Sequence, residues 1–194
     1  MIGKLEEALA EYLKAELLNA NHSWTQKKLA YCFRALKKPQ EALEYYKKVA
    51  ALNPDNLSVQ LSIGHCYLEL KNYSEALKCY FKVEYLTNSK EKAWRPIAWC
   101  SFLTGKYDEA MDYYSKILEN NPNAVDYLNA GHVKLSMGKN KEALNLYRQA
   151  LSAQGGSYEK FLESFTSDIP DLLQAGVKHE NIPVLLDCLM YEIL

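Results

Sequence analysis

Hydrophobic and small residues recur along this chain at spacings of three and four, which is the pattern of amphipathic α-helices that bury one face. The helices come in pairs joined by a short polar turn. Each second helix carries the tripeptide Glu-Ala-Leu, or Glu-Ala-Met in one copy, near its start. The alanine of this tripeptide recurs at intervals of 34, 34, 34 and 33 residues, at Ala8, Ala42, Ala76, Ala110 and Ala143. A period of this length predicts an array of stacked helical hairpins.

Two further columns follow the same period. A tyrosine stands four residues after each alanine, at Tyr12, Tyr46, Tyr80, Tyr114 and Tyr147. A small residue recurs in the first helices, at Ala30, Gly64, Ala98 and Gly131. We expect the small residues to be buried where paired helices approach closely, and the tyrosines to pack across the seam to the neighbouring hairpin. One hairpin cannot bury its hydrophobic face alone, so stacking must create the core.

Glycine and proline punctuate the predicted helices. Gly105 and Gly138 supply the glycine that commonly follows a helix end, and Lys37 and Lys71 stand in the same column. Pro54 and Pro122 fall where a second helix must stop before the next hairpin begins. Pro96 lies early in a first helix, which we therefore expect to start late, near Ala93, or to kink.

These columns resemble the tetratricopeptide repeat family, with which they share the 34-residue period and the pattern of small, alanine, aromatic and proline positions. The resemblance covers about residues 1–155. It implies an all-α fold, a right-handed α-solenoid of stacked helix-turn-helix repeats with C-terminal capping helices. Repeats are expected at 23–56, 57–90, 91–123 and 124–155. The stretch Lys92-Ala93-Trp94-Arg95-Pro96-Ile97-Ala98-Trp99-Cys100, with the C-terminal tail, also resembles a group of these proteins from Bacteroidetes bacteria, which implies a lineage but no particular activity.

The start of the chain aligns with the second half of a hairpin. Gly3-Lys4 is assigned to a hairpin turn, and residues 1–22 to the second helix of an incomplete repeat. We expect the chain to be part of a longer protein, with a lone capping helix as the alternative. The helix carries a stripe of leucines that we expect to be partly uncovered and to favour self-association. The stripe consists of Leu5, Leu9, Leu13 and Leu17.

After the last repeat, residues 156–194 are expected to form a helical cap. Tyr158–Phe165 is a short amphipathic helix, and Ser167-Asp168-Ile169-Pro170 is typical of a helix start with a serine cap and an early proline. Gly176 is expected to end that helix, and a last helix follows His179. A separate binding element is the alternative to a cap.

Charge and hydropathy exclude several classes of function. The formal net charge of −1 argues against nucleic-acid binding, which needs a strongly basic surface. No apolar run approaches the roughly 20 residues that span a bilayer, so no membrane insertion is expected. Acidic residues arrive within the first six positions, unlike a secretory signal peptide, and a cytoplasmic location is expected.

The titratable residues give no catalytic or metal-binding motif. Cys32, Cys66 and Cys100 occupy one repeat column and are expected to be buried, reduced thiols, as are Cys79 and Cys188. No Cys-x-x-Cys spacing, zinc-protease motif, phosphate loop or nucleophile elbow is present. The sequence therefore predicts no enzyme, no catalytic residue, no metal and no cofactor.

A candidate binding surface lies on the first helices, which line the concave face of this fold. One column places four rings, and flanking positions add positive charge. We expect these residues to form one groove for an acidic peptide, because aromatic and arginine side chains anchor interfaces and cations attract acidic partners. The alternative is that Tyr31 and Trp99 merely pack against neighbouring helices. The proposed groove comprises Tyr31, His65, Trp99, His132, Lys27, Arg34, Lys92 and Arg95.

The leading hypothesis is thus a protein–protein interaction module, an adaptor that binds a partner segment. A self-assembling structural scaffold and the regulatory part of a longer multidomain protein are the alternatives. Relatives that clamp the acidic tails of heat-shock chaperones use five polar positions. Only Lys27 and Lys92 match them here, while Tyr31, Ser62 and Pro96 fill the others, so that particular clamp is not expected.

Overall fold

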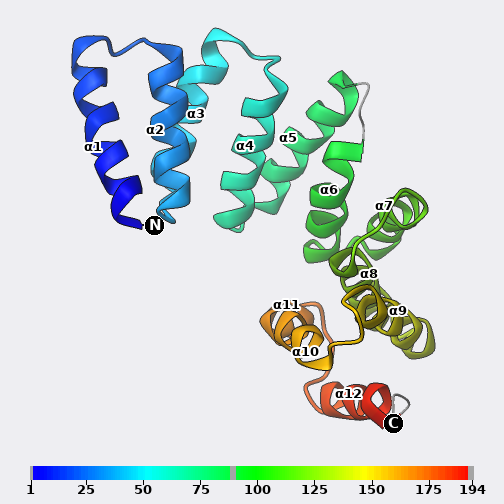
Figure 1. Ribbon diagram of the computed structural model, residues 1–194. Coiled ribbons are helices and arrows are strands. Elements are labelled where there is room, and N and C mark those ends of the chain that lie inside the picture. Colours follow the sequence, from blue (N-terminus) through cyan, green and yellow to red (C-terminus); the bar gives the residue numbers. More distant parts are fainter. Residues whose placement is uncertain (1, 88–90, 192–194) are drawn as a thin grey trace. The chain divides into compact units, whose positions relative to one another are not determined.

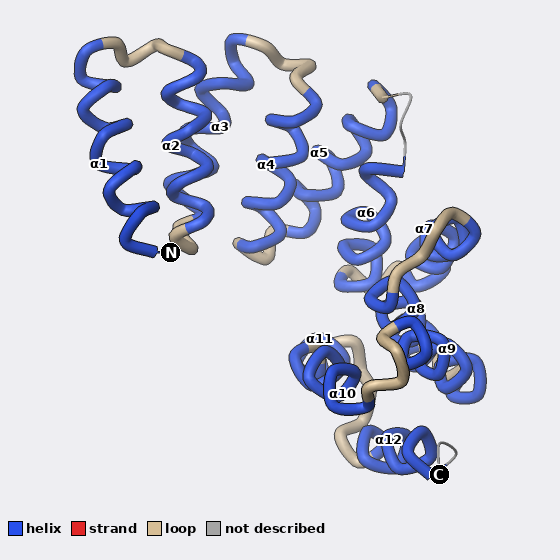
Figure 2. Tube along the Cα trace, viewed as in Figure 1, coloured by secondary structure: helices blue, strands red, loops and turns tan. Residues whose placement is uncertain are grey.

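The computed structural model describes residues 2–87 and 91–191, and the side chains of all of these except Ile2 (Figure 1). Every regular element in the described ranges is an α-helix, and the connections between them are short (Figure 2). The chain divides into two compact units, Met1–Ala93 and Trp94–Leu194. The sequence prediction of an all-α repeat fold is confirmed.

The first unit consists of stacked antiparallel helices. They are α1 (Ile2–Leu18), α2 (Ser23–Ala35), α3 (Pro39–Leu52), α4 (Leu57–Glu69), α5 (Tyr73–Leu86) and the first residues of α6 (Glu91–Leu103). Helices α2 and α3 form one hairpin, and α4 and α5 form the next, with α3 packed against α4. The repeat columns form the core between them, so its members are Ala30, Ala42, Leu43, Tyr46, Val49, Val59, Ile63 and Cys66.

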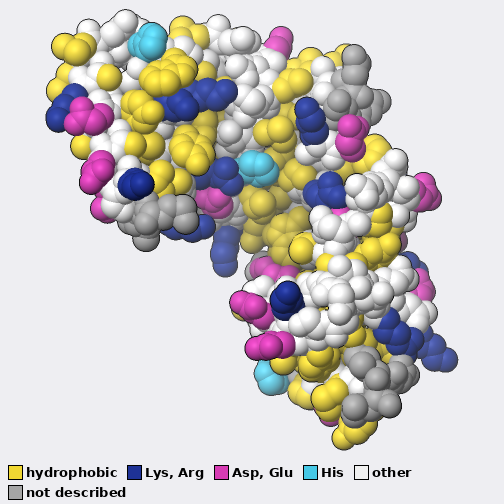
Figure 3. Space-filling model, viewed as in Figure 1, with side chains coloured by type: hydrophobic (Ala, Val, Ile, Leu, Met, Phe, Trp, Pro, Cys, Tyr) yellow, Lys and Arg dark blue, Asp and Glu magenta, His cyan; other side chains and the backbone are white. Residues whose placement is uncertain are grey.

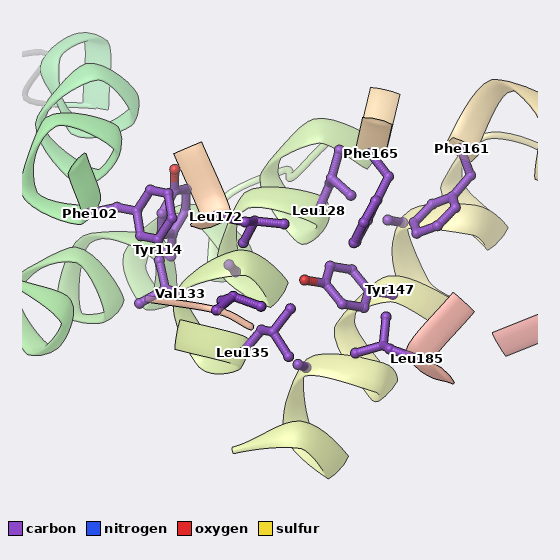
Figure 4. Close-up of a cluster of buried hydrophobic side chains, with 14 of the residues drawn as sticks. Phe102, Tyr114, Leu128, Val133, Leu135, Tyr147, Phe161, Phe165, Leu172 and Leu185 are labelled. Carbon is purple, nitrogen blue, oxygen red and sulfur yellow. The ribbon is translucent and has the colours of Figure 1, made fainter. Parts of the chain in front are cut away.

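The second unit continues the hairpins and adds three capping helices. It contains the rest of α6, then α7 (Tyr107–Glu119), α8 (Ala124–Ser136), α9 (Asn140–Ala153), α10 (Tyr158–Ser167), α11 (Ile169–Gln174) and α12 (Asn181–Tyr191). Phe161 and Phe165 of α10, Leu172 of α11 and Leu189 of α12 are fully buried. They join one continuous core with the repeat residues around Tyr147 (Figure 4). The tail therefore forms the cap that the sequence predicted.

The small column is buried as expected. Ala30 and Ala98 have no exposed surface, and Gly64 and Gly131 are also buried. A methyl group added at either glycine would overlap the ring of the tyrosine on the following helix, Tyr80 for Gly64 and Tyr147 for Gly131. Glycine is needed at these two positions because an aromatic ring occupies the space of a side chain.

The four hairpin turns share one backbone conformation. Lys37, Lys71, Gly105 and Gly138 all have a positive φ, between 58° and 75°. The N–H of the residue after each donates to a carbonyl five residues earlier, as from Asn72 to Tyr67 at 2.8 Å. This is the Schellman arrangement that closes a helix end. The prediction that lysine replaces glycine in two of these turns is confirmed.

Three helix boundaries differ from the sequence predictions. Gly3 and Lys4 lie inside α1 and form no turn, because no preceding helix folds back there among the described residues. Helix α6 includes Glu91, so it does not start late and Pro96 lies within it. Because proline has no N–H, the carbonyl of Lys92, in the first turn of α6, has no backbone donor at position 96. Asp168, rather than Ser167, is the cap residue of α11, and the Ser167 hydroxyl donates back to the Ser164 carbonyl at 2.7 Å.

The cysteine prediction holds for the repeat column and is wrong at the C-terminus. Cys32, Cys66 and Cys100 are buried free thiols, and burial raises the pKa of Cys66 to about 11 and that of Cys100 to about 12. Cys79 is half-buried. Cys188 of α12 is exposed.

Candidate functional site

Two large aromatic side chains stand exposed on α2. Tyr31 is 59% exposed and Trp24 is 55% exposed, two turns apart on the same helix. Figure 3 shows hydrophobic side chains next to those of Lys and Arg over α2. The rings of Trp24 and Tyr12 of α1 form a T-shaped pair with centroids 5.7 Å apart, and the Lys28 ammonium lies 5.4 Å from the centroid of the Trp24 ring. This face of α2 therefore combines exposed rings with positive charge.

Tyr31 lines two pockets in the first unit. The larger, of about 370 Å³, lies between α2 and α4. The other, of about 230 Å³, is further along α2. The larger pocket is lined by Trp24, Lys27, Lys28, Tyr31, Tyr46, Ser58 and Ser62. The smaller one is lined by Tyr31, Arg34, Ala35, Lys37 and Glu69.

Cross-repeat hydrogen bonds orient the cations of this surface. The Lys27 ammonium donates to the Ser58 hydroxyl at 2.9 Å. The Arg34 guanidinium donates to the Glu69 carboxylate at 2.8 Å. No acidic side chain lines the larger pocket, so the positive charge there is uncompensated. In the smaller pocket, Glu69 forms an ion pair with Arg34, so Lys37 is the lining residue whose positive charge is not paired with Glu69.

His65 lies beside this surface but is half-buried. Its Nδ1 and the Tyr80 hydroxyl are 2.8 Å apart, which fixes the ring against its own hairpin. Burial lowers the pKa of His65, and the neighbouring Arg34 lowers it further, while Glu69 acts in the opposite direction. His65 is therefore neutral at physiological pH, and it adds no positive charge to the surface.

Two predicted site residues of the second unit are engaged within their own unit. Trp99 is half-buried, and its ring lies 5.2 Å from that of Phe102. Arg95 makes two hydrogen bonds of 2.8 Å to Asp126, a carboxylate that is 4% exposed on its side chain. Asp126 also closes the capping box of α8 with Asn123. Lys92 of α6 is exposed.

His132 differs from the expectation, because it is fully buried. Its Nδ1 lies 2.9 Å from the Tyr147 hydroxyl and its Nε2 lies 3.3 Å from Asp168. The Phe165 ring covers it at 5.2 Å. Capping helix α10 and the residue after it thus enclose this ring, and it cannot line a groove in this arrangement. Burial lowers its pKa, and the nearby Asp168 opposes that shift.

Sequence reasoning missed part of the pocket. Lys28 and Ser58 line it, although neither stood out in the repeat alignment. Lys28 is adjacent to the predicted Lys27, so a broader reading of the charged turn of α2 could have found it. Ser58 has no comparable signal, because its role depends on the distance between two neighbouring repeats.

Two kinds of feature in the described residues bear on function, metal-binding clusters and membrane-spanning helices. No group of three or more His, Cys, Asp or Glu side chains within residues 2–87 and 91–191 is arranged to hold a metal ion. In the same ranges, no helix combines the length and the hydrophobicity that crossing a bilayer requires. What the geometry offers is a surface of rings, ammonium groups and hydroxyls, which suits recognition of another chain.

The fold and this surface define an α-helical repeat protein of the class that mediates protein–protein interactions. Tetratricopeptide repeat models match residues 33–85, 97–124 and 127–156. The chain belongs to the tetratricopeptide repeat family. A search of the curated proteins found no match.

Solved structures of the same fold include three that cover most of this chain. A tetratricopeptide repeat protein from Parabacteroides merdae is 24% identical, with a TM-score of 0.65 over 97% of this chain and 78% of that one. MamA is 20% identical, with a TM-score of 0.70 over 79% and 90%. YrrB, a repeat protein with an unusual peptide-binding site, is 22% identical, with a TM-score of 0.68 over 79% and 80%. At these identities the likeness shows the fold alone.

Proposed function

We propose that this protein is an interaction module that binds an acidic peptide segment of a partner on the face of α2 and α4. The single observation that carries the proposal is Tyr31, an exposed ring with a pocket on either side of it. Tyr31 and Trp24 place two exposed rings on one helix, and aromatic side chains are common anchors of interfaces. Lys27 and Lys28 beside Tyr31 favour carboxylates over ammonium groups.

The two pockets differ in what they accept. The pocket beside Trp24 is lined by two lysines, two serines and two tyrosines and by no acid, so it suits an Asp or Glu side chain. The pocket beside Arg34 contains Glu69, so it suits a polar or neutral side chain. They flank Tyr31 at positions about one helical turn to each side, which an extended peptide spans with about three residues. His132 is left out because it is buried; participation of His65, Lys92, Arg95 and Trp99 stays a prediction from the sequence.

The test uses an array of peptides that differ only in their content of Asp and Glu against Lys and Arg. Purified full-length chain should prefer the acidic peptides. Tyr31→Ala should weaken binding of the best acidic peptide by about ten-fold or more, measured by fluorescence polarisation, as for an interface anchor. Tyr85→Ala is the matched control, because Tyr85 of α5 is 87% exposed and lines neither pocket. A preference for basic peptides, or equal binding by both variants, would contradict the proposal.

One observation favours the scaffold alternative as well. Leu17 and Leu18 at the end of α1 are 89% and 90% exposed. Adjacent exposed leucines on a helix are a common element of contacts between chains. Self-association through α1 is therefore the second candidate function, and it leaves the α2 surface free.

A further inference from the structure

A third pocket lies in the second unit, between the start of α9 and α12. Its volume is about 220 Å³. Three leucines form its walls, one each from α8, α9 and α12, and Val184 and Cys188 of α12 stand at its edge. The pocket is lined by Leu135, Asn140, Lys141, Leu144, Asn181, Val184, Leu185 and Cys188.

The outer side of α12 is unlike that of an ordinary cap. Ile182, Leu185 and Leu189 are buried against the core (Figure 4 labels Leu185). Yet Val184 is 63% exposed, and Tyr191, two turns further on, is 69% exposed. Hydrophobic side chains reach the surface over α12 in Figure 3. Capping elements of repeat proteins normally present a polar outer face, so these apolar groups are not explained by capping.

The charged side chain that lines the pocket is basic. Lys141 lines it, and Lys139 lies exposed two residues earlier. Glu142 is paired with Lys134 at 2.7 Å, and both this hydrogen bond and the charge of Lys139 lower the pKa of Glu142, so Glu142 compensates Lys139 in part. Asp187 of α12 is exposed but is not among the lining residues, and none of those is acidic. The two asparagines, Asn140 and Asn181, add amide donors at the rim.

We propose that this pocket docks a segment of a partner protein that inserts one aliphatic side chain and places a carboxylate beside Lys141. The apolar walls select the aliphatic group, and Lys141, a cation in a lining without an acid, selects the carboxylate. The volume is below the about 300 Å³ at which small-molecule sites begin, so it suits a side chain better than a cofactor. This surface is independent of the α2 surface: either can fail its test without affecting the other.

Cys188 provides a built-in probe, since its exposed thiol lines the pocket. In a Cys79→Ser background, the full-length chain is equilibrated with three cysteine-containing peptides, each supplied as its mixed disulfide with 2-mercaptoethanol. The Cys188 thiolate attacks the peptide sulfur, so the protein–peptide disulfide forms as 2-mercaptoethanol leaves, and added 2-mercaptoethanol keeps this exchange reversible. The peptides are Cys-Leu-Glu, Cys-Leu-Lys and Cys-Gly-Glu, each acetylated and amidated. Mass spectrometry measures the fraction of Cys188 that carries each peptide. Cys32, Cys66 and Cys100 are buried and do not compete.

Cys-Leu-Glu should be captured more than Cys-Leu-Lys by about two- to five-fold, the range of an exposed ion pair. It should exceed Cys-Gly-Glu by about ten-fold, as expected for burying most of a leucine side chain. Lys141→Glu should reverse the preference between the first two peptides. Val184→Ser should reduce capture of both leucine peptides, whereas Val125→Ser, at a valine of α8 that is 50% exposed, should not.

Equal capture of the three peptides would overturn the proposal, as would a preference that Lys141→Glu leaves unchanged. Competition distinguishes a peptide from a lipid-like ligand. Acetyl-Leu-Glu amide should displace Cys-Leu-Glu at lower concentration than hexanoate does. Displacement by hexanoate at the lower concentration would overturn the assignment to a partner protein.

Discussion

The Nδ1 of His132 lies 2.9 Å from the hydroxyl of Tyr147, and both rings are buried. The same pair recurs in the first unit, between His65 and Tyr80 at 2.8 Å. Both pairs follow a glycine in the small column, and the tyrosine ring lies where that glycine lacks a side chain. Where the column holds alanine, at Ala30 and Ala98, the next residue is Tyr31 or Trp99 instead. In these two repeats, the glycine makes room for the tyrosine ring and the following histidine contacts the tyrosine hydroxyl.

Gly131→Ala is expected to lower the free energy of unfolding by about 1–3 kcal/mol, because the new methyl group overlaps the Tyr147 ring. Urea denaturation measures this. A double-mutant cycle with Tyr147→Leu should show that the smaller side chain relieves part of the cost. Additive costs would mean that the glycine is required for another reason.

His132 should make the protein less stable in acid. Burial lowers its folded-state pKa below the unfolded value of about 6.5, so protonation favours the unfolded chain. Its contribution is fully present above pH 6.5 and is lost as the pH falls through the folded pKa. Asp168 and Asp171 oppose the effect, since both stabilise the charged ring. Between pH 8 and pH 5, the melting temperature should fall less steeply for His132→Gln than for the unsubstituted chain. Equal slopes of melting temperature against pH would contradict this assignment.

Lys71→Gly is expected to stabilise the protein by about 1 kcal/mol, because lysine at a φ of 58° carries the strain of a side chain in the left-handed region. Gly138→Ala, which places a side chain at another hairpin turn with a positive φ, should destabilise the protein by a similar amount. Lys71 is exposed and lines neither pocket of the α2 surface, so peptide binding should not change. Chemical denaturation with an unchanged m-value is the measurement. Loss of stability in Lys71→Gly would show that the lysine side chain makes a compensating contact.

Arg95→Ala is expected to cost about 1 kcal/mol of stability, since it leaves the buried Asp126 carboxylate without its guanidinium partner while half of the Arg95 side chain is already exposed. Lys27→Ala should leave stability within about 0.5 kcal/mol, because its partner Ser58 is exposed. Thermal unfolding of the two variants tests this difference. Equal effects would mean that the Arg95–Asp126 pair is not formed in solution.

Leu17→Glu is expected to abolish any self-association through α1, because it places a charge in the most exposed part of the leucine stripe. Sedimentation velocity at micromolar concentration should show association of the unsubstituted chain and a monomer for this variant. Leu52→Glu is the control, since Leu52 of α3 is 63% exposed and lies on another helix. A clean monomer for the unsubstituted chain would exclude this scaffold function.

The arrangement of the candidate surface on α2 was predictable in part. The repeat alignment placed Lys27, Tyr31 and Arg34 on one face of one helix, because residues three or four apart share a face. It could not show that Glu69 neutralises Arg34, or that Ser58 orients Lys27. Those contacts join positions 35 and 31 residues apart, and their lengths depend on how closely neighbouring hairpins pack.

The sequence by itself determined the repeat, the hairpin turns and the buried small column. These follow from local chemistry: the period of hydrophobic positions, the residues that end helices, and the space available at Ala30 or Gly64. The tertiary structure decided which members of a column stay accessible. Tyr31 and His132 occupy equivalent positions, yet Tyr31 is 59% exposed and His132 is fully buried. The difference arises because α10 and Asp168 fold over the last repeat, and a contact between segments distant in sequence leaves no mark on the repeat that it covers.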